Sequence, residues 1–316
     1  MKDFTFEPSK WVPFKDKKVV EKIRSIKKED ITKHPNPDLK IRIVRDEDFD
    51  FLNVIDIFSR IKNASDKGNQ LVLIVPQQDP LLAKVAYLIN KFRVNCKKLY
   101  TFNMDEWADE NGNIAPETYP YGFLHAMKHN FYYKIDEELR PPEKQITGPT
   151  NENFKYYGKM IEDLGGADVC YGGIGWSSHI AFVDPDTEEF AGTLEEFKHM
   201  GPRIVTLNPF TIAQSSIAPD AGKSGDWSSI APRAATIGPK EVLGAKLRSS
   251  WNPFIIGGSS ISWQRFTVRL ALFGPVTPKI PASILQLARS EIYLTETIAQ
   301  DIENDRTWLV NDFFSE

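Results

Sequence analysis

The chain has 316 residues, of which 41% are hydrophobic and 26% are charged, and its formal net charge is −4. This composition is typical of a globular protein with a large core, and the acidic balance argues against a protein that binds duplex nucleic acid. Because the apolar runs are short, we expect no membrane-spanning helix. Two isolated cysteines, Cys96 and Cys170, and no recognisable secretory leader favour the reducing cytoplasm.

The first 40 residues read as an N-terminal extension, and residues 41–316 as a single α/β domain. Within the extension, KDKKVVEKIRSIKKED (15–30) predicts a charged helix that packs through one apolar side. The two prolines of HPNPDL (34–39) then break the chain before the first predicted strand.

From residue 41 onward, predicted strands alternate with predicted helices. The predicted strands are residues 41–44, 71–75, 97–102, 168–173, 203–207, 233–238, 253–258 and 291–295. The predicted helices are residues 51–61, 81–92, 117–133 and 153–164. This alternation predicts an α/β fold with a Rossmann-like, mostly parallel sheet flanked by helices, and a ligand site at the carboxyl ends of the strands.

An acidic pair, Asp105 and Glu106, directly follows the predicted strand 97–102. A carboxylate at a strand end is partly removed from water, which raises its pKa and suits it to act as a base near neutral pH. The alternative is structural, since one of the two acids could cap the segment that follows. The residues alone leave both interpretations open.

The stretch GIGWSSHIAFVDP (173–185) places a histidine after another predicted strand. A histidine side chain is suited to move protons near neutral pH, and Asp184 lies close enough along the chain to orient the imidazole ring of His179. The alternative is a histidine that simply packs beside Phe182 in the core.

The same stretch offers backbone and hydroxyl groups to a ligand. Gly173 and Gly175 allow close approach of backbone amides, and Ser177 and Ser178 provide polar side chains. The glycine spacing is too short for a dinucleotide-binding fingerprint, and Ser177 lacks the GxSxG context of a hydrolase nucleophile.

Two further patterns favour structural roles. His125 and His129 are four residues apart on a predicted helix, but no third ligand accompanies them, so we predict surface histidines and no metal site. The tryptophans could line a sugar site, although most tryptophans belong to cores or helix faces. They are Trp107, Trp176, Trp227, Trp251 and Trp263.

Several motifs resemble the glucosamine-6-phosphate isomerase/deaminase family over residues 41–300. The matching segments, in order, are TFNMDEW, GIGWSSHIAFVDP, AATIGPKEVLGAK and PASILQLARSEIYLTE. The resemblance implies a sugar-phosphate isomerase/deaminase-like fold and an enzyme that opens a pyranose ring and moves a proton between C2 and C1. It also implies that no cofactor and no metal take part.

The resemblance implies roles for three residues. Asp105 matches the aspartate that moves the proton, and His179 matches the histidine that assists ring opening. Asp184 stands where the family has the glutamate that supports this histidine, and its side chain is one methylene shorter.

The chain also departs from the family pattern where charge and phosphate are handled. Ser177 replaces an aspartate, and the loop PQQDP (76–80) lacks the glycines of the usual phosphate cradle and brings in a carboxylate. A serine also stands where the family has its phosphate lysine. The residues expected to contact the substrate are Glu106, Gln77, Gln78, Asp79, Gly173, Gly175, Ser177, Ser178, Ser259 and Ser260.

These departures predict an altered substrate, such as a sugar without the usual phosphate, unless Lys223, Arg233 or Arg265 supplies a relocated anion site. The alternative function is a non-catalytic sugar-binding or regulatory protein of the same fold, and a sugar-phosphate lactonase is a third interpretation. The expected partner is a small sugar or sugar phosphate, with no nucleic acid and no membrane. Because the family often forms dimers or hexamers, a homo-oligomer stays open.

Overall fold

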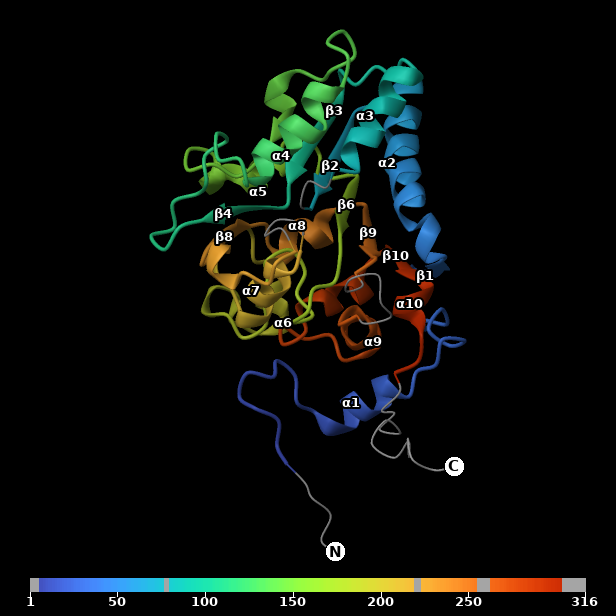
Figure 1. Ribbon diagram of the computed structural model, residues 1–316, viewed down its shortest axis with the longest axis vertical. Coiled ribbons are helices and arrows are strands. Elements are labelled where there is room, and N and C mark those ends of the chain that lie inside the picture. The colour runs from blue at the N-terminus through green and yellow to red at the C-terminus, as the bar shows by residue number, and fades with distance from the viewer. Residues whose placement is uncertain (1–5, 77–79, 219–222, 255–261, 303–316) are drawn as a thin grey trace, which may run out of the picture.

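A computed structural model describes residues 6–76, 80–218, 223–254 and 262–302 (Figure 1). The strands are β1 (Leu39–Val44), β2 (Leu71–Val75), β3 (Leu99–Asn103), β4 (Asp105–Ala108), β5 (Ile146–Thr147), β6 (Val169–Gly172), β7 (Arg203–Thr206), β8 (Arg233–Thr236), β9 (Leu247–Asn252) and β10 (Ser290–Thr295). The helices are α1 (Lys17–Arg24), α2 (Phe49–Asp66), α3 (Leu82–Lys91), α4 (Phe123–Asn130), α5 (Tyr157–Glu162), α6 (Leu194–Lys198), α7 (Pro209–Ser216), α8 (Pro239–Gly244), α9 (Gln264–Phe273) and α10 (Glu296–Ala299).

The larger sheet has seven strands in the order β1-β10-β9-β6-β2-β3-β5, and every neighbouring pair is parallel. All five residues of β2 are buried, as expected for a strand covered on both faces. The strand order reverses between β2 and β6, so the loops after these two strands diverge and leave room for a ligand. The predicted α/β fold with a parallel sheet is confirmed.

A smaller antiparallel sheet with the order β4-β8-β7 lies beside the first. The predicted strands 203–207 and 233–238 belong to this second sheet. Met104 alone separates β3 from β4, and it bonds to both sheets: its N–H donates to Val75 O at 2.7 Å, and its carbonyl accepts from Ile237 N at 3.0 Å. Asp105 is therefore the first residue of the smaller sheet.

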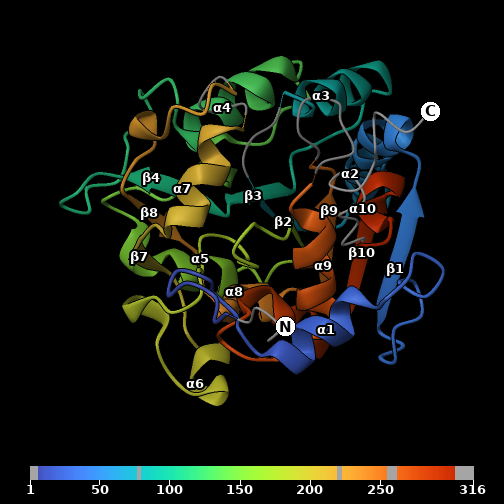
Figure 2. The same ribbon diagram turned by 60° about the horizontal axis from the view of Figure 1, so that its bottom comes forward.

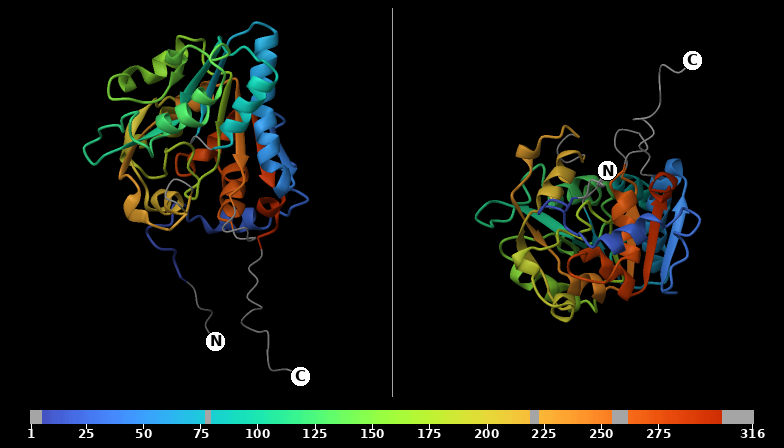
Figure 3. Two further views of the ribbon diagram at one scale, coloured as in Figure 1. Left: turned by 45° about the horizontal axis from the view of Figure 1, so that its top comes forward. Right: turned by 90° about the horizontal axis from the view of Figure 1, so that it is seen from below.

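Helices cover both faces of the larger sheet (Figures 1 and 3). Apolar residues of α2, α3 and α4 form one core cluster with β2 and β3, including Ile57, Val85 and Met127. Residues of α8 and α9 belong to a second cluster on the other face, together with β10. None of the helices in the described ranges is both long and apolar enough to cross a bilayer.

The strand predicted at 253–258 is wrong in its first two residues, which follow the strand β9 at Leu247–Asn252; residues 255–258 lie outside the described part of the chain. The segment LRSSWN has no apolar run, yet every residue is buried. Its polar side chains find hydrogen-bond partners both nearby and far along the chain. Arg248, for example, donates to the carbonyls of Leu243, Ala245 and Arg289. Because these buried side chains are polar and hydrogen-bonded within the fold, the segment has no hydrophobic pattern from which a strand could be predicted.

The N-terminal segment is part of the core, although its helix is shorter than predicted. Ile23 and Ile31 are fully buried in the same cluster as α9. The buried Arg269 of α9 donates to Ile26 O at 3.0 Å and to Ala299 O and Gln300 O at 2.9 Å each, so one guanidinium group ties the N-terminal segment to the end of α10. The division into an extension (1–40) and a domain (41–316) stays a prediction.

Candidate functional site

The site forms where β4 meets the loop between β6 and α6. Asp105 is only 6% exposed, and its Oδ1 accepts the N–H of Phe182 at 3.3 Å. Phe182 belongs to the same loop as His179, so the acid and the histidine predicted at different strand ends are brought to one place. Asp105 is therefore hydrogen-bonded directly to the backbone of the loop that carries His179.

Burial raises the pKa of Asp105 to about 7. Hydrogen bonds from Thr236 and from the Phe182 N–H act in the opposite direction, as does the charge of His179, while Glu106 adds a smaller upward effect. The carboxyl group can thus both release and accept a proton near neutral pH, which a general base requires.

Glu106 occupies a different environment. Its carboxylate accepts the N–H groups of Phe123 at 2.9 Å and Leu124 at 2.8 Å, and also that of Trp107 at 3.0 Å. Phe123 and Leu124 are the first residues of α4, whose N-terminal N–H groups need acceptors and favour negative charge. These contacts account for Glu106 as the cap of α4, and its predicted contact with a substrate stays untested.

His179 lies in a cage of three polar side chains around its Nδ1 atom. The Oγ1 of Thr211 is 2.9 Å away, the Oγ of Ser177 3.0 Å, and Asp184 Oδ1 3.1 Å. Both hydroxyls also donate to Asp184, Ser177 at 2.6 Å and Thr211 at 2.7 and 2.8 Å. The backbone N–H of Asn208 adds a fourth bond to this carboxylate at 3.1 Å.

This cage determines which nitrogen of His179 carries the proton. Each hydroxyl has one hydrogen, and both hydrogens point to Asp184, so toward the imidazole the two oxygens can only accept. Nδ1 must therefore be the protonated nitrogen, and Nε2 of the neutral ring is the basic one.

Asp184 keeps its negative charge in this setting. Burial alone would raise its pKa, but the charge of His179 and the hydrogen bonds from His179, Ser177 and Thr211 outweigh burial, and the pKa is lowered. Ser177 thus donates a hydrogen bond to Asp184, the carboxylate that orients His179.

The backbone of the loop is shaped around the imidazole ring. A Cβ atom on Gly175 would lie 2.0 Å from His179 Nε2, so no other residue fits there without moving the ring. Gly173 also lies close to another backbone, since a Cβ on it would be 3.0 Å from Trp251 O. Ser178 and Ala181 have φ angles of 64° and 52°, a left-handed conformation that costs free energy in residues other than glycine.

Other predicted candidates fall outside the described residues or have partners elsewhere. Gln77, Gln78, Asp79, Ser259 and Ser260 lie outside the described ranges. Arg233 pairs with Glu189 at 3.9 Å, and Arg265 donates to Thr297 O at 3.0 Å.

Thr211, Asn208 and Thr236 belong to the site but were missed by the sequence analysis. Asn208 and Pro209 do carry a signal, because an asparagine followed by a proline is typical of a helix start, and Asn208 Oδ1 caps α7 through the Phe210 N–H at 2.9 Å. That signal places the helix but cannot show that Thr211, in its first turn, reaches a carboxylate 27 residues earlier.

Trp176 begins a row of aromatic rings beside the histidine loop. Its ring stacks on Trp263 with centroids 5.0 Å apart, and Trp263 contacts Phe254 at 3.6 Å. The other tryptophans differ: Trp107 packs between Phe123 and Phe182, Trp251 stacks on Tyr293, and Trp227 is largely exposed.

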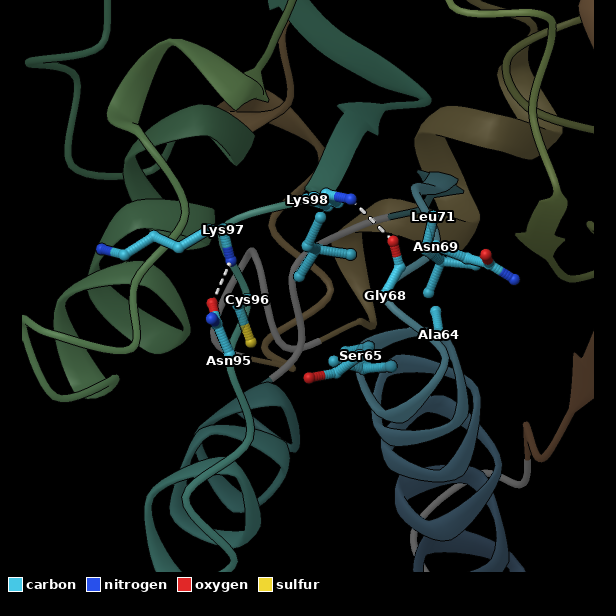
Figure 4. Close-up of a pocket in the computed structure, with 11 residues that line it drawn as sticks. Ala64, Ser65, Gly68, Asn69, Leu71, Asn95, Cys96, Lys97 and Lys98 are labelled. Carbon is cyan, nitrogen blue, oxygen red and sulfur yellow. Dashed lines mark hydrogen bonds between the residues drawn. The ribbon is translucent and has the colours of Figure 1, made fainter.

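A separate pocket of about 130 Å³ lies between the end of α2 and the starts of β2 and β3, at the opposite edge of the parallel sheet (Figure 4). Lys98 Nζ donates to Gly68 O at 2.7 Å beside it, and Cys96, whose pKa is raised to about 12 by burial, lines its wall. This pocket contains none of the predicted site residues. Among the described residues, no cluster of three or more histidine, cysteine or acidic side chains could hold a metal ion.

Comparisons with known proteins find relatives that are named glucosamine-6-phosphate deaminases. No family model matches the sequence. The glucosamine-6-phosphate deaminase of Caenorhabditis elegans is 29% identical over 197 residues, which are 60% of this chain and 66% of that protein. The deaminase of Lachnoclostridium phytofermentans is 28% identical over 200 residues, 63% of this chain and 74% of that protein.

Solved structures with the same fold cover most of the chain. A monomeric glucosamine-6-phosphate deaminase, described as a missing link of the NagB superfamily, aligns with a TM-score of 0.61 at 20% identity and covers 83% of this chain and 98% of its own. The 6-phosphogluconolactonase of Leishmania guyanensis aligns with a TM-score of 0.54 at 11% identity, and the alignment covers 83% of this chain and 98% of that protein. In sequence the chain is thus similar, at 28–29% identity, to glucosamine-6-phosphate deaminases, and it shares its fold with a solved structure of one.

Proposed function

We propose that the chain is an enzyme that opens the ring of an amino sugar or a related sugar and transfers a proton between C2 and C1. Asp105 is the base that moves the proton, and His179, held by Asp184, assists ring opening. The observation that carries this proposal is the buried Asp105 carboxyl, with a pKa of about 7, hydrogen-bonded to the loop that holds His179.

The first step uses the histidine. Nε2 of the neutral ring takes the proton of the anomeric hydroxyl as the bond between C1 and the ring oxygen breaks, and the imidazolium then returns this proton to the ring oxygen. Asp184 stabilises the imidazolium that forms, because its carboxylate accepts from Nδ1. Ser177 and Thr211 hold that carboxylate in place.

The second step uses Asp105. Once the ring is open, the C2 proton is acidified by the neighbouring carbonyl carbon, and the carboxylate removes it to give an enol or enolamine. The protonated Asp105 then returns the proton to C1. With an amino group at C2, an imine remains there, and addition of water releases ammonia and leaves a ketose.

The substrate is expected to differ from glucosamine 6-phosphate. Ser177 brings no charge to the cage, while the loop residues Asp79 and Ser260 replace groups that hold phosphate in the family. Two like charges about 4 Å apart repel by about 4 kcal/mol at an effective dielectric of 20, so a carboxylate in the phosphate cradle disfavours a phosphate there. We therefore propose an unphosphorylated or otherwise modified sugar, handled in the cytoplasm without cofactor, metal, nucleic acid or membrane.

The test combines binding with isotope exchange. A thermal-shift screen of amino sugars, ketoses and their phosphates identifies ligands, and each ligand is then incubated with the enzyme in deuterium oxide. We expect deuterium at C1 or C2 of at least one ligand and its loss in Asp105→Asn, with ligand binding retained. Ligands that bind the wild type without exchange would instead favour the non-catalytic sugar-binding protein, and rapid ammonia release from glucosamine 6-phosphate would contradict the altered substrate.

A further inference from the structure

A cleft lies beside the histidine loop, and neither Asp105 nor His179 is among the residues that line it. It has a volume of about 300 Å³ and lies between the N-terminal segment, the loop residues Trp176–Ser178 and α9. Figure 2 shows α1 at the lower end of α9, and residues of α1 and of the segment before it line this cleft. A volume of this size is at the lower end of that found for small-molecule sites.

The cleft is positively charged. Lys15, Lys17 and Arg24 line it, and no acidic side chain does so among the described residues. Lys17 pairs with the exposed Glu7, whereas Lys15 and Arg24 form no ion pair with any described residue. Uncompensated cations around a cleft favour an anionic ligand group.

The rest of the lining is aromatic and apolar. Phe14, Trp176 and Phe266 are half-buried and face the same cleft, together with Val20 and Leu270. Aromatic faces beside cationic side chains suit a flat apolar body that carries a negative group at one end.

Ser178 adds an independent observation. It lines the cleft, is 1% exposed, and its Oγ has no hydrogen-bond partner in the part of the chain that the structure describes. A buried hydroxyl without a partner costs free energy, and its left-handed backbone adds to that cost. Rotation of the Ser178 side chain toward the cleft would let a ligand oxygen supply the missing partner.

We propose that this cleft binds a small organic anion, with an aromatic or apolar body against Phe14, Trp176 and Phe266 and its negative group near Arg24, Lys15 and Ser178. Such a ligand would contact the back of the segment whose Ser177 holds His179 and Asp184. The binding itself does not depend on the proposed function, because it can be measured without turnover.

The experiment uses phenyl phosphate as the probe on the full chain, with inorganic phosphate and phenol as its two halves, followed by titration calorimetry. We expect one saturable site for phenyl phosphate with a Kd about tenfold or more below that of either half. Arg24→Ala and Lys15→Ala should each weaken binding about fivefold. Lys22→Ala, an exposed cation on the same helix outside the cleft, is the matched control and should change the Kd less than about twofold.

Three results would overturn the proposal. One is the absence of saturation at millimolar phenyl phosphate, and another is inorganic phosphate binding as tightly as the whole probe. The third is an equal loss in Lys22→Ala and Arg24→Ala. The variant Asp105→Asn separates this site from the catalytic one. An unchanged affinity for phenyl phosphate supports binding in the cleft. A lost affinity places the probe beside Asp105 and contradicts the proposal.

The contact with Ser177 gives a second readout. Titration with phenyl phosphate should shift the imidazole proton resonances of His179 in the wild type, and Arg24→Ala should need about fivefold more phenyl phosphate for the same shift. Binding that leaves the His179 resonances in place would contradict the contact with the back of the loop.

Discussion

Burial raises the pKa of the Asp105 carboxyl, its hydrogen bonds lower this pKa, and the effect of burial is the larger one. The folded chain therefore holds this proton up to about pH 7, whereas the unfolded carboxyl releases it near its ordinary pKa of 3.8. Because the unfolded state binds fewer protons in this range, Asp105 lowers the free energy of unfolding as pH rises from about 4 to about 7. The full cost above pH 7 is about 4 kcal/mol.

Asp105→Asn removes this titration, so the variant should gain stability relative to the wild type at pH 8 and gain little at pH 5. Urea denaturation at the two pH values measures the difference, which we expect to be on the order of 2–4 kcal/mol. Glu110→Gln changes an exposed acid two residues after the end of β4, and it should show the same difference in stability from the wild type at both pH values. A wild-type stability that does not fall between pH 5 and 8 relative to Asp105→Asn would contradict the buried carboxyl.

Gly175 tests the shape of the histidine loop. Gly175→Ala would push the His179 ring away, because its Cβ would meet Nε2 at 2.0 Å. We expect loss of isotope exchange by about 100-fold or more, since small displacements of catalytic groups have large effects. Gly244→Ala is the control, as a Cβ there meets nothing within 4 Å, and it should leave exchange near the wild-type rate.

Thr211 tests the cage around Asp184. Thr211→Val keeps the side-chain volume but removes a hydroxyl that donates to both carboxylate oxygens. We expect kcat to fall about tenfold with KM little changed, and the acid limb of the pH–rate profile to move to higher pH because Asp184 loses a donor that favours its charged form. Thr206→Val, on the exposed face of β7, is the control. An unchanged pH profile would show that Thr211 only fills space.

At the scale of elements, Glu106 joins β4 to α4. Glu106→Gln replaces one acceptor oxygen with a donor that faces backbone N–H groups, so we expect a loss of about 1–2 kcal/mol in the free energy of unfolding. Isotope exchange should stay within about twofold of the wild type, because the carboxylate contacts the helix end. Exchange that collapses while stability is kept would instead favour the substrate contact predicted from the sequence.

The elements also show how far the sequence could be read. Buried apolar runs such as β2 were predicted correctly because hydrophobicity is local information. Asp105 and His179 could be assigned to loops after strands by the same means. β9 and Thr211 were missed because their polar groups are satisfied by residues distant along the chain. The degree of burial of Asp105 could likewise not be predicted from the sequence, because it depends on the packing of Phe182 from another loop.

At the scale of the whole molecule, the N-terminal segment contributes fully buried residues to a core shared with α9. Ile23→Ala should therefore cost about 2–4 kcal/mol in the free energy of unfolding, with a single denaturation transition. Val19→Ala on the same helix should cost less than half as much, because Val19 is only partly buried. Two separate transitions, or an Ile23→Ala variant as stable as the wild type, would show that the segment folds apart from the domain.

Met104 is the one-residue step between β3 and β4, with its N–H bonded to the larger sheet and its carbonyl to the smaller one. Since side chains alternate between faces along a strand, inserting or deleting a single residue here would turn Asp105 away and bring a neighbour into its place. The number of residues at this junction therefore decides which side chain faces the loop of His179, whereas substitutions in the loops beyond it leave that placement unchanged.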